Sequence, residues 1–245
     1  MTRRLAAALL VLLTTATSLS AALAGPASAA DPVYGAPVVG QCSDLSPGER
    51  EEASYGEAPV DCAGPHTAQV IAVVQLPDRL DLGSRGLEVF ALRSCYAAQE
   101  QALGAPLRQV RFSTYDVAWF VPDADQQAAG ARWVRCELVL PSGRRLEPLP
   151  QVPALGERPL ADEVARCMTR TRFRAVVCAD DHDFRMVRAL TVRGERFRDV
   201  RGWARLGMDR CRLPSGRTPT AFAWPTRAAW RAGDRSLLCF DGERP

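Results

Sequence analysis

Two pairs of residues in this sequence have the types and the spacing of metal ligands. Cys62 is followed four residues later by His66, and Cys178 is followed four residues later by His182. Thiolate sulfur and imidazole nitrogen are ligands that zinc prefers in proteins. The two pairs together could supply a four-ligand zinc site, so one interpretation of the chain is a secreted zinc-dependent hydrolase. That chemistry requires both cysteines to be free thiolates.

The first 30 residues predict a compartment in which free thiolates are not expected. Residues 1–30 combine two arginines, an apolar run over 5–13 and small residues at the end, which is typical of a secretory signal peptide. No later stretch is apolar enough to cross a bilayer, so we expect a secreted or envelope-associated protein. All eight cysteines follow this segment, and an even number of cysteines in an exported chain indicates disulfides. We then expect His66 and His182 to lie beside disulfides and to hydrogen-bond a turn, with no metal and no cofactor.

The cysteines and histidines belong to an internal repeat. Three residues of the first half recur 116 positions later and four recur 103 positions later. The matched pairs are Cys62 and Cys178, His66 and His182, Cys95 and Cys211, Pro122 and Pro225, Gly130 and Gly233, Arg132 and Arg235, and Cys136 and Cys239. Cys42 and Cys167 open the two copies. The sequence therefore predicts two tandem modules, and the change of offset places 13 extra residues in the first module, around 103–117.

The elements that position these residues follow from hydrophobic periodicity. Every second residue from Ala68 to Leu76 is apolar, and the equivalent run over 184–192 has the same pattern with an interruption at Arg188, which predicts strands with one buried face. Helical spacing follows over 87–102 and 203–211, and further strands are expected over 133–140 and 236–240. Each module is thus predicted to be α+β, a small antiparallel sheet with one helix packed on it. We expect modules over 31–140 and 160–245, joined by a semi-rigid, proline-rich linker over 141–159.

Duplication requires equivalent disulfides in the two modules. We favour Cys42–Cys62 with Cys95–Cys136, and Cys167–Cys178 with Cys211–Cys239. A bond between the second and third cysteines of each module would also suit their constant spacing of 33 residues.

Charge is distributed unevenly between the modules. Residues 31–140 hold eight arginines against fifteen acids, whereas residues 160–245 hold eighteen arginines against eleven acids. The halves could attract each other, the second could meet an anionic partner such as wall polymer or lipid headgroups, or both could be ordinary solvated surfaces. Trp119 and Trp203 align with apolar residues and are expected in the core. The preferred contact surface lies in the second module, at Trp224, Arg227, Trp230 and Arg231.

No catalytic arrangement is apparent in the sequence. It has no Gly-x-Ser-x-Gly elbow, phosphate-binding loop or dinucleotide fingerprint. Acids flank His182, but the equivalent residues around His66 are not acidic, so a shared active site is not indicated. We therefore expect no catalytic residues and no nucleic-acid partner.

One family resemblance covers nearly all of the chain after residue 30. Gly40-Gln41-Cys42, followed by the run from Val60 to His66 that leads into a strand, resembles the septum formation domain of actinobacteria. The second copy is more divergent, because Asp180-Asp181-His182 replaces the Gly-Pro-His step. The resemblance implies an extracytoplasmic, disulfide-bonded module associated with cell division, without established catalytic residues. We expect such a protein to bind cell-wall polymer or a division-associated protein.

Overall fold

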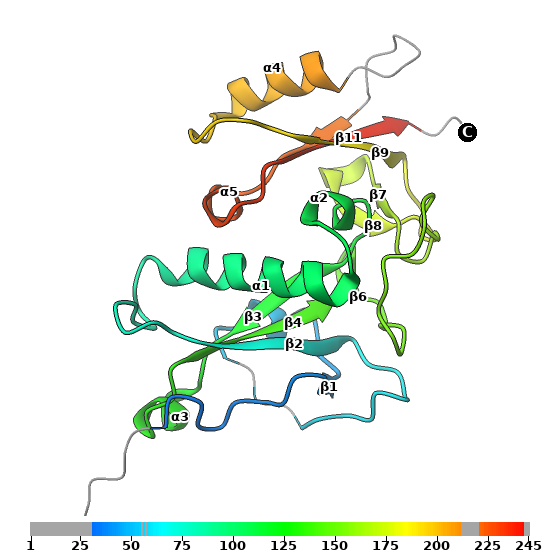
Figure 1. Ribbon diagram of the computed structural model, residues 1–245. Coiled ribbons are helices and arrows are strands. Elements are labelled where there is room, and N and C mark those ends of the chain that lie inside the picture. The colour runs from blue at the N-terminus through cyan, green and yellow to red at the C-terminus, as the bar shows by residue number, and fades with distance from the viewer. Residues whose placement is uncertain (1–30, 55, 57, 212–220, 243–245) are drawn as a thin grey trace, which may run out of the picture.

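The first half of the molecule is an antiparallel sheet covered by one long helix. The structure, a computed structural model, describes residues 31–242 except for 55, 57 and 212–220. The sheet has the order β1-β2-β4-β3, and helix α1 packs across it (Figure 1). The elements are β1 (Cys42–Ser43), η1 (Glu49–Glu51), β2 (Ala68–Gln75), α1 (Leu87–Leu103), α2 (Leu107–Val110), β3 (Asp116–Phe120), α3 (Ala124–Ala128) and β4 (Trp133–Val139).

The second half is a five-stranded antiparallel sheet of order β10-β11-β9-β7-β8. Helix α4 lies on the side of this sheet that is remote from the first half, whereas α5 lies near α1 (Figure 1). The elements are β7 (Arg166–Met168), η2 (Thr171–Phe173), β8 (Ala175–Val177), β9 (Phe184–Thr191), α4 (Val200–Arg210), β10 (Ala221–Ala223), α5 (Arg227–Ala232) and β11 (Ser236–Gly242).

The two sheets share their topology and their register. The order β1-β2-β4-β3 corresponds to β7-β9-β11-β10, with β8 added at one edge of the second sheet. Equivalent Cα pairs are Cys42–Gln69 and Cys167–Arg185, Ala72–Cys136 and Arg188–Cys239, and Trp119–Cys136 and Phe222–Cys239. Residues on the central strand pairs therefore correspond at the same offsets that relate the two halves of the sequence.

The predicted fold class is confirmed. Each half is α+β with an antiparallel sheet, and the predicted strands and the two predicted helices are present within a few residues of their expected bounds. The short helices α3 and α5 were not predicted. Each follows a proline, Pro122 or Pro225, and is capped by a side chain, Asp123 or Thr226, that accepts a hydrogen bond from the third residue along. The prolines indicated only a turn at these places.

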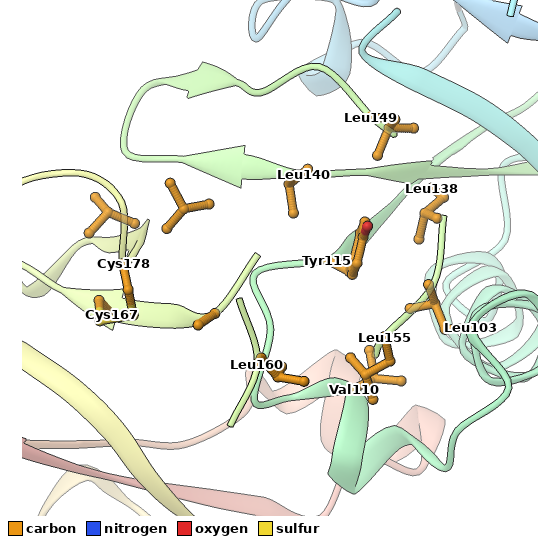
Figure 2. Close-up of a cluster of buried hydrophobic side chains, with 13 residues drawn as sticks. Leu103, Val110, Tyr115, Leu138, Leu140, Leu149, Leu155, Leu160, Cys167 and Cys178 are labelled. Carbon is orange, nitrogen blue, oxygen red and sulfur yellow. A yellow bond between two sulfur atoms is a disulfide. The ribbon is translucent and has the colours of Figure 1, made fainter. Parts of the chain in front are cut away.

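The segment between the halves is packed rather than extended. It forms a two-stranded hairpin, β5 (Pro141–Ser142) with β6 (Arg145–Leu146). Leu149, Leu155 and Leu160 then enter one buried cluster with Tyr115 of the first half and Cys167 of the second (Figure 2). The expected spacer thus contributes its leucines to the core. The prolines between these leucines prevent a regular helix. The domain boundaries themselves stay a prediction.

The extra residues of the first half dock it onto the second. After α2, the Thr114 amide donates to the Val164 carbonyl at 2.8 Å, and the Arg166 amide donates to the Phe112 carbonyl at 2.8 Å. On the other side of the interface, Ala229 and Ala232 of α5 join the buried cluster around α1.

The predicted signal peptide covers residues 1–30, which lie outside the described residues. None of the described helices is long and apolar enough to span a membrane.

Candidate functional site

All eight cysteines are bonded, in the pairing that the sequence favoured. Cys42–Cys62 and Cys167–Cys178 each fasten the first strand of a half to the turn before its first long strand, β2 or β9. Cys95–Cys136 joins α1 to β4, and Cys211–Cys239 joins the end of α4 to β11, and both strands are interior strands of their sheets. Each bond contributes about 2–4 kcal/mol, largely by restricting the unfolded chain. The cysteines are therefore structural.

The histidines occupy equivalent places in the turns that follow Cys62 and Cys178. The Nδ1 of His66 lies 3.0 Å from the Gly64 carbonyl oxygen, and the Nδ1 of His182 lies 2.8 Å from the Asp180 carbonyl oxygen. Each ring nitrogen therefore binds the carbonyl two residues earlier in the turn, as the structural interpretation of the sequence expected. His66 is fully buried, with its own carbonyl bound by the Leu149 amide.

This arrangement removes the basis for the zinc hydrolase. Cys62 and Cys178, the proposed thiolate ligands, are bonded to Cys42 and Cys167. Cys167, Cys178 and His182 do lie together, with potential ligand atoms within 4.8 Å of one another, but the two sulfurs form a disulfide. A disulfide sulfur lacks the negative charge that makes thiolate a zinc ligand.

The predicted contact surface of the second half is not one patch. Trp230 is only 1% exposed, and its Nε1 donates to the Glu195 carbonyl at 2.9 Å. It is a core residue, packed edge-on against Trp203, so its predicted accessibility is wrong. Arg227 and Arg231 are exposed, and Trp224 is half-buried. Trp224 is the member of this group that lines a cleft between the halves.

That cleft, of about 780 Å³, is the candidate functional site. Its aromatic lining comes from both halves: Tyr96 on α1 and Trp119 on β3 from the first, and Trp224, which follows β10, from the second. Trp119 was expected in the core and is instead half-buried at the cleft wall. Trp203, for which the same expectation held, is fully buried and stacks in parallel on Trp224, with ring centroids 6.1 Å apart.

A buried ion pair joins the halves at the cleft. Arg111 donates from Nε to Asp234 Oδ2 at 2.9 Å, and its guanidinium lies 4.9 Å from the centre of the Tyr96 ring. Both members of the pair are almost fully buried. The charges of this pair are opposite to the net charges of the halves, because the cation Arg111 belongs to the acidic half and the anion Asp234 to the basic half. Net attraction between oppositely charged halves therefore does not account for this contact.

Arg166 also lines the cleft, and its guanidinium binds backbone carbonyls and, within the described part of the chain, no carboxylate. Its Nε donates to the carbonyls of Arg111 and Ser113, at 3.0 and 2.8 Å. Among the described residues no carboxylate lies within ion-pair distance of Arg166. Burial, together with the positive charge of Arg111, lowers the pKa of Arg166 to about 10. At neutral pH the cleft is thus lined by two guanidinium groups, of which Arg111 is buried and Arg166 is partly buried.

The outer part of the cleft is acidic. Asp116 accepts a hydrogen bond from Arg50 at 2.8 Å, while Glu51, Glu52 and Glu88 are exposed at the rim. Aromatic faces beside carboxylates and guanidinium groups suit a ligand with apolar ring faces and many hydroxyl groups. Neither histidine lines this cleft.

Sequence reasoning missed most of these residues. Tyr96, Arg111 and Asp234 come from three separate segments, and nothing in their local patterns links them. The one available signal was the 13-residue excess in the first half, which contains Arg111 and marks the docking segment.

The fold and its bonds define a disulfide-stapled α+β protein of two similarly built halves. A family model described as Septum formation matches residues 83–205, which is half of the chain. The chain therefore belongs to the septum formation family. The match is one continuous stretch that begins just before α1 and ends within α4, so it crosses both halves and does not separate two copies. No curated protein matches the chain, and no solved structure does.

Proposed function

We propose that this protein acts outside the cytoplasm, in septum formation, as a non-catalytic protein that binds cell-wall glycan in the cleft between its halves. The observation that carries the proposal is the pair of half-buried tryptophans, Trp119 and Trp224, which line one cleft from different halves. Family membership supports the role in division. The four disulfides and the signal-like residues 1–30 support an extracytoplasmic location.

The proposal includes duplication of one module. It is supported by matched cysteine pairing, matched histidine contacts and matched strand register in the two halves. Under duplication, two copies of an aromatic-proline turn supply the two walls of one site: Trp119 precedes Pro122 in the first copy, and Trp224 precedes Pro225 in the second. Such a site exists only when both copies are present and docked.

The lining suits sugars better than it suits a protein surface. A pyranose presents an apolar face that stacks on an indole ring, and its hydroxyl groups pair with charged planar groups. The cleft volume of about 780 Å³ lies within the range of small-ligand pockets. Because acids outnumber arginines around the cleft, neutral or amine-bearing sugars are favoured over strongly anionic polymers.

The proposal does not include glycoside hydrolysis, although carboxylates line the cleft. Such hydrolysis uses one protonated acid and one carboxylate on either side of the bond. Asp116 and Asp234, the two acids of the cleft that are not fully exposed, each accept a hydrogen bond from an arginine, so both are already engaged within the protein. The proposed activity is therefore binding without cleavage.

Co-sedimentation with purified cell-wall sacculi tests this function. Trp119→Ala and Trp224→Ala should each weaken binding about fivefold or more, because each removes one stacking surface, worth about 1 kcal/mol or more. Phe173→Ser is the matched control, since Phe173 is an aromatic residue that is 62% exposed and lies outside the cleft. It should leave binding unchanged.

Three results would contradict the proposal. If the wild-type protein does not sediment with sacculi, glycan is not the ligand. If Phe173→Ser loses as much binding as the cleft variants, the cleft is not the binding site. Release of soluble sugar fragments by the wild type would show catalysis.

A further inference from the structure

Five arginines surround a single hollow on the second half, away from the cleft. The hollow encloses about 810 Å³ and is formed by the loop before α4, by α4 itself and by the start of α5. We call this group the arginine hollow; its members are Arg193, Arg196, Arg198, Arg205 and Arg227. Two acids, Glu195 and Asp199, also line it. The positive charges therefore outnumber the negative ones by three.

These arginines have no ionic partner within the described part of the chain. None of the five forms an ion pair there. Arg198 lies over Trp203, 5.5 Å from the ring centre, and Arg227 lies over Phe197 at 4.9 Å. The Asp199 carboxylate is already engaged, because it caps α4 by accepting from the Gly202 amide at 2.7 Å. Like charges held this close repel one another, so an anion that binds several of them at once gains from all.

The outer face of α4 adds apolar side chains to this charge. Met208 is 53% exposed and Val200 is 70% exposed. Met208 lies on the same helical face as Arg201 and Arg205, seven and three residues earlier. Helix α4 itself lies on the side of its sheet that is remote from the first half (Figure 1), and its buried residues are Trp203 and Gly207. A soluble polyanion gains little from exposed methionine and valine, whereas the boundary of a bilayer takes up both apolar and cationic side chains.

We propose that the arginine hollow and the outer face of α4 bind the phosphate headgroups of an anionic lipid bilayer. The acidic first half then faces away from the membrane, because its net charge is repelled by the same surface. This attachment is reversible and peripheral. The arginine hollow shares no lining residue with the cleft, so lipid binding and glycan binding can be tested independently.

Vesicle co-sedimentation of the full secreted chain tests the proposal. The protein should sediment with vesicles of phosphatidylglycerol and phosphatidylcholine, should lose binding as salt rises, and should not sediment with pure phosphatidylcholine. The double variant R196E/R205E should bind at least tenfold more weakly. Both side chains are exposed and free of described hydrogen bonds or ion pairs, so the fold should be retained.

The matched control makes the same change of net charge elsewhere. R79E/R85E alters two exposed arginines of the first half and should change vesicle binding less than twofold. Met208→Ser should weaken binding several-fold while it keeps the salt dependence, because it removes only the apolar contact. Equal loss in both double variants would overturn the site. Binding to soluble polyphosphate without binding to anionic vesicles would overturn the lipid as ligand, as would full vesicle binding by Met208→Ser.

Discussion

The two halves of the molecule have the same sheet and very different helices. Helix α1 buries seven residues, from Leu87 to Leu103, and is enclosed between its own sheet and α5 of the other half. Helix α4 buries only Trp203 and Gly207 and presents its other side to solvent. The comparison shows that sheet register and disulfides preserve the module, whereas the helix face is free to take a local role. In the first half that role is to form a cleft, and in the second it is to form an outer surface.

The difference between the halves is clearest at two pairs of equivalent positions. Ala91 of α1 corresponds to Gly207 of α4, and Ala131 corresponds to Asp234. Both residues of the second half are specialised. Gly207 gives the Phe222 ring room to lie against the helix, and Asp234 binds Arg111 across the interface. Placing the first-half residue at the second-half position tests each specialisation.

The largest effect is expected for Asp234→Ala. It leaves Arg111 buried, with Asp116 as its remaining ion-pair partner at 3.9 Å and with the positive charge of Arg166 nearby. Loss of one partner of a buried ion pair costs about 3–5 kcal/mol. Denaturant unfolding should show a loss of that size in the free energy of unfolding. Asp81→Ala, which removes an exposed pair with Arg132, should cost less than about 0.5 kcal/mol. Similar losses in both variants would show that the buried pair between Arg111 and Asp234 contributes no more stability than the exposed pair between Arg132 and Asp81.

A smaller loss is expected for Gly207→Ala. The added Cβ would lie 2.4 Å from a carbon of the Phe222 ring, so helix or ring must shift. Such overpacking costs about 1–3 kcal/mol, although the same change in an exposed helix would stabilise by about 1 kcal/mol. In a thermal unfolding cycle, Phe222→Ala should largely abolish the cost of Gly207→Ala. A stabilised single variant would mean that α4 does not rest on this ring.

The smallest effect concerns pH and the first half, which contains all four tyrosines. Burial raises the pKa of Tyr115 to about 12, whereas a tyrosine in the unfolded chain has a pKa of about 10. The folded chain therefore keeps a proton that the unfolded chain releases. The resulting contribution to stability is complete below about pH 10 and is lost as pH rises from about 10 to about 12.

Tyr115→Phe removes this contribution. Between about pH 9 and about pH 11, the wild type should lose about 1 kcal/mol more unfolding free energy than the variant. The change should cost little at neutral pH, because the described residues provide no hydrogen-bond partner for the buried Tyr115 hydroxyl. Tyr34→Phe, at an exposed position, is the control and should follow the wild type. Parallel pH profiles for wild type and Tyr115→Phe would show that this phenol does not report on folding.

The sequence predicted the features that the two halves share, and it did not predict the contacts that join the halves. Strands, long helices and disulfides follow from periodicity and from equivalent spacing, which are properties of one segment or of two matched segments. The cleft depends on contacts such as Arg111 with Asp234, between residues that are not equivalent and lie far apart in the chain. Trp230 was misplaced because its arginine-rich neighbours suggested a surface. It is the second turn of α5 that directs its ring inward, onto Trp203 and Phe197.

The enclosure of α1 has a consequence for how the chain folds and comes apart. Its outer side is covered by Ala229 and Ala232, from a helix that lies more than a hundred residues later. Separation of the halves would uncover that side and the leucines of residues 141–160 together. We therefore expect the two halves to unfold together as one cooperative unit, because a protease or a mechanical load that separates them exposes buried surface of both.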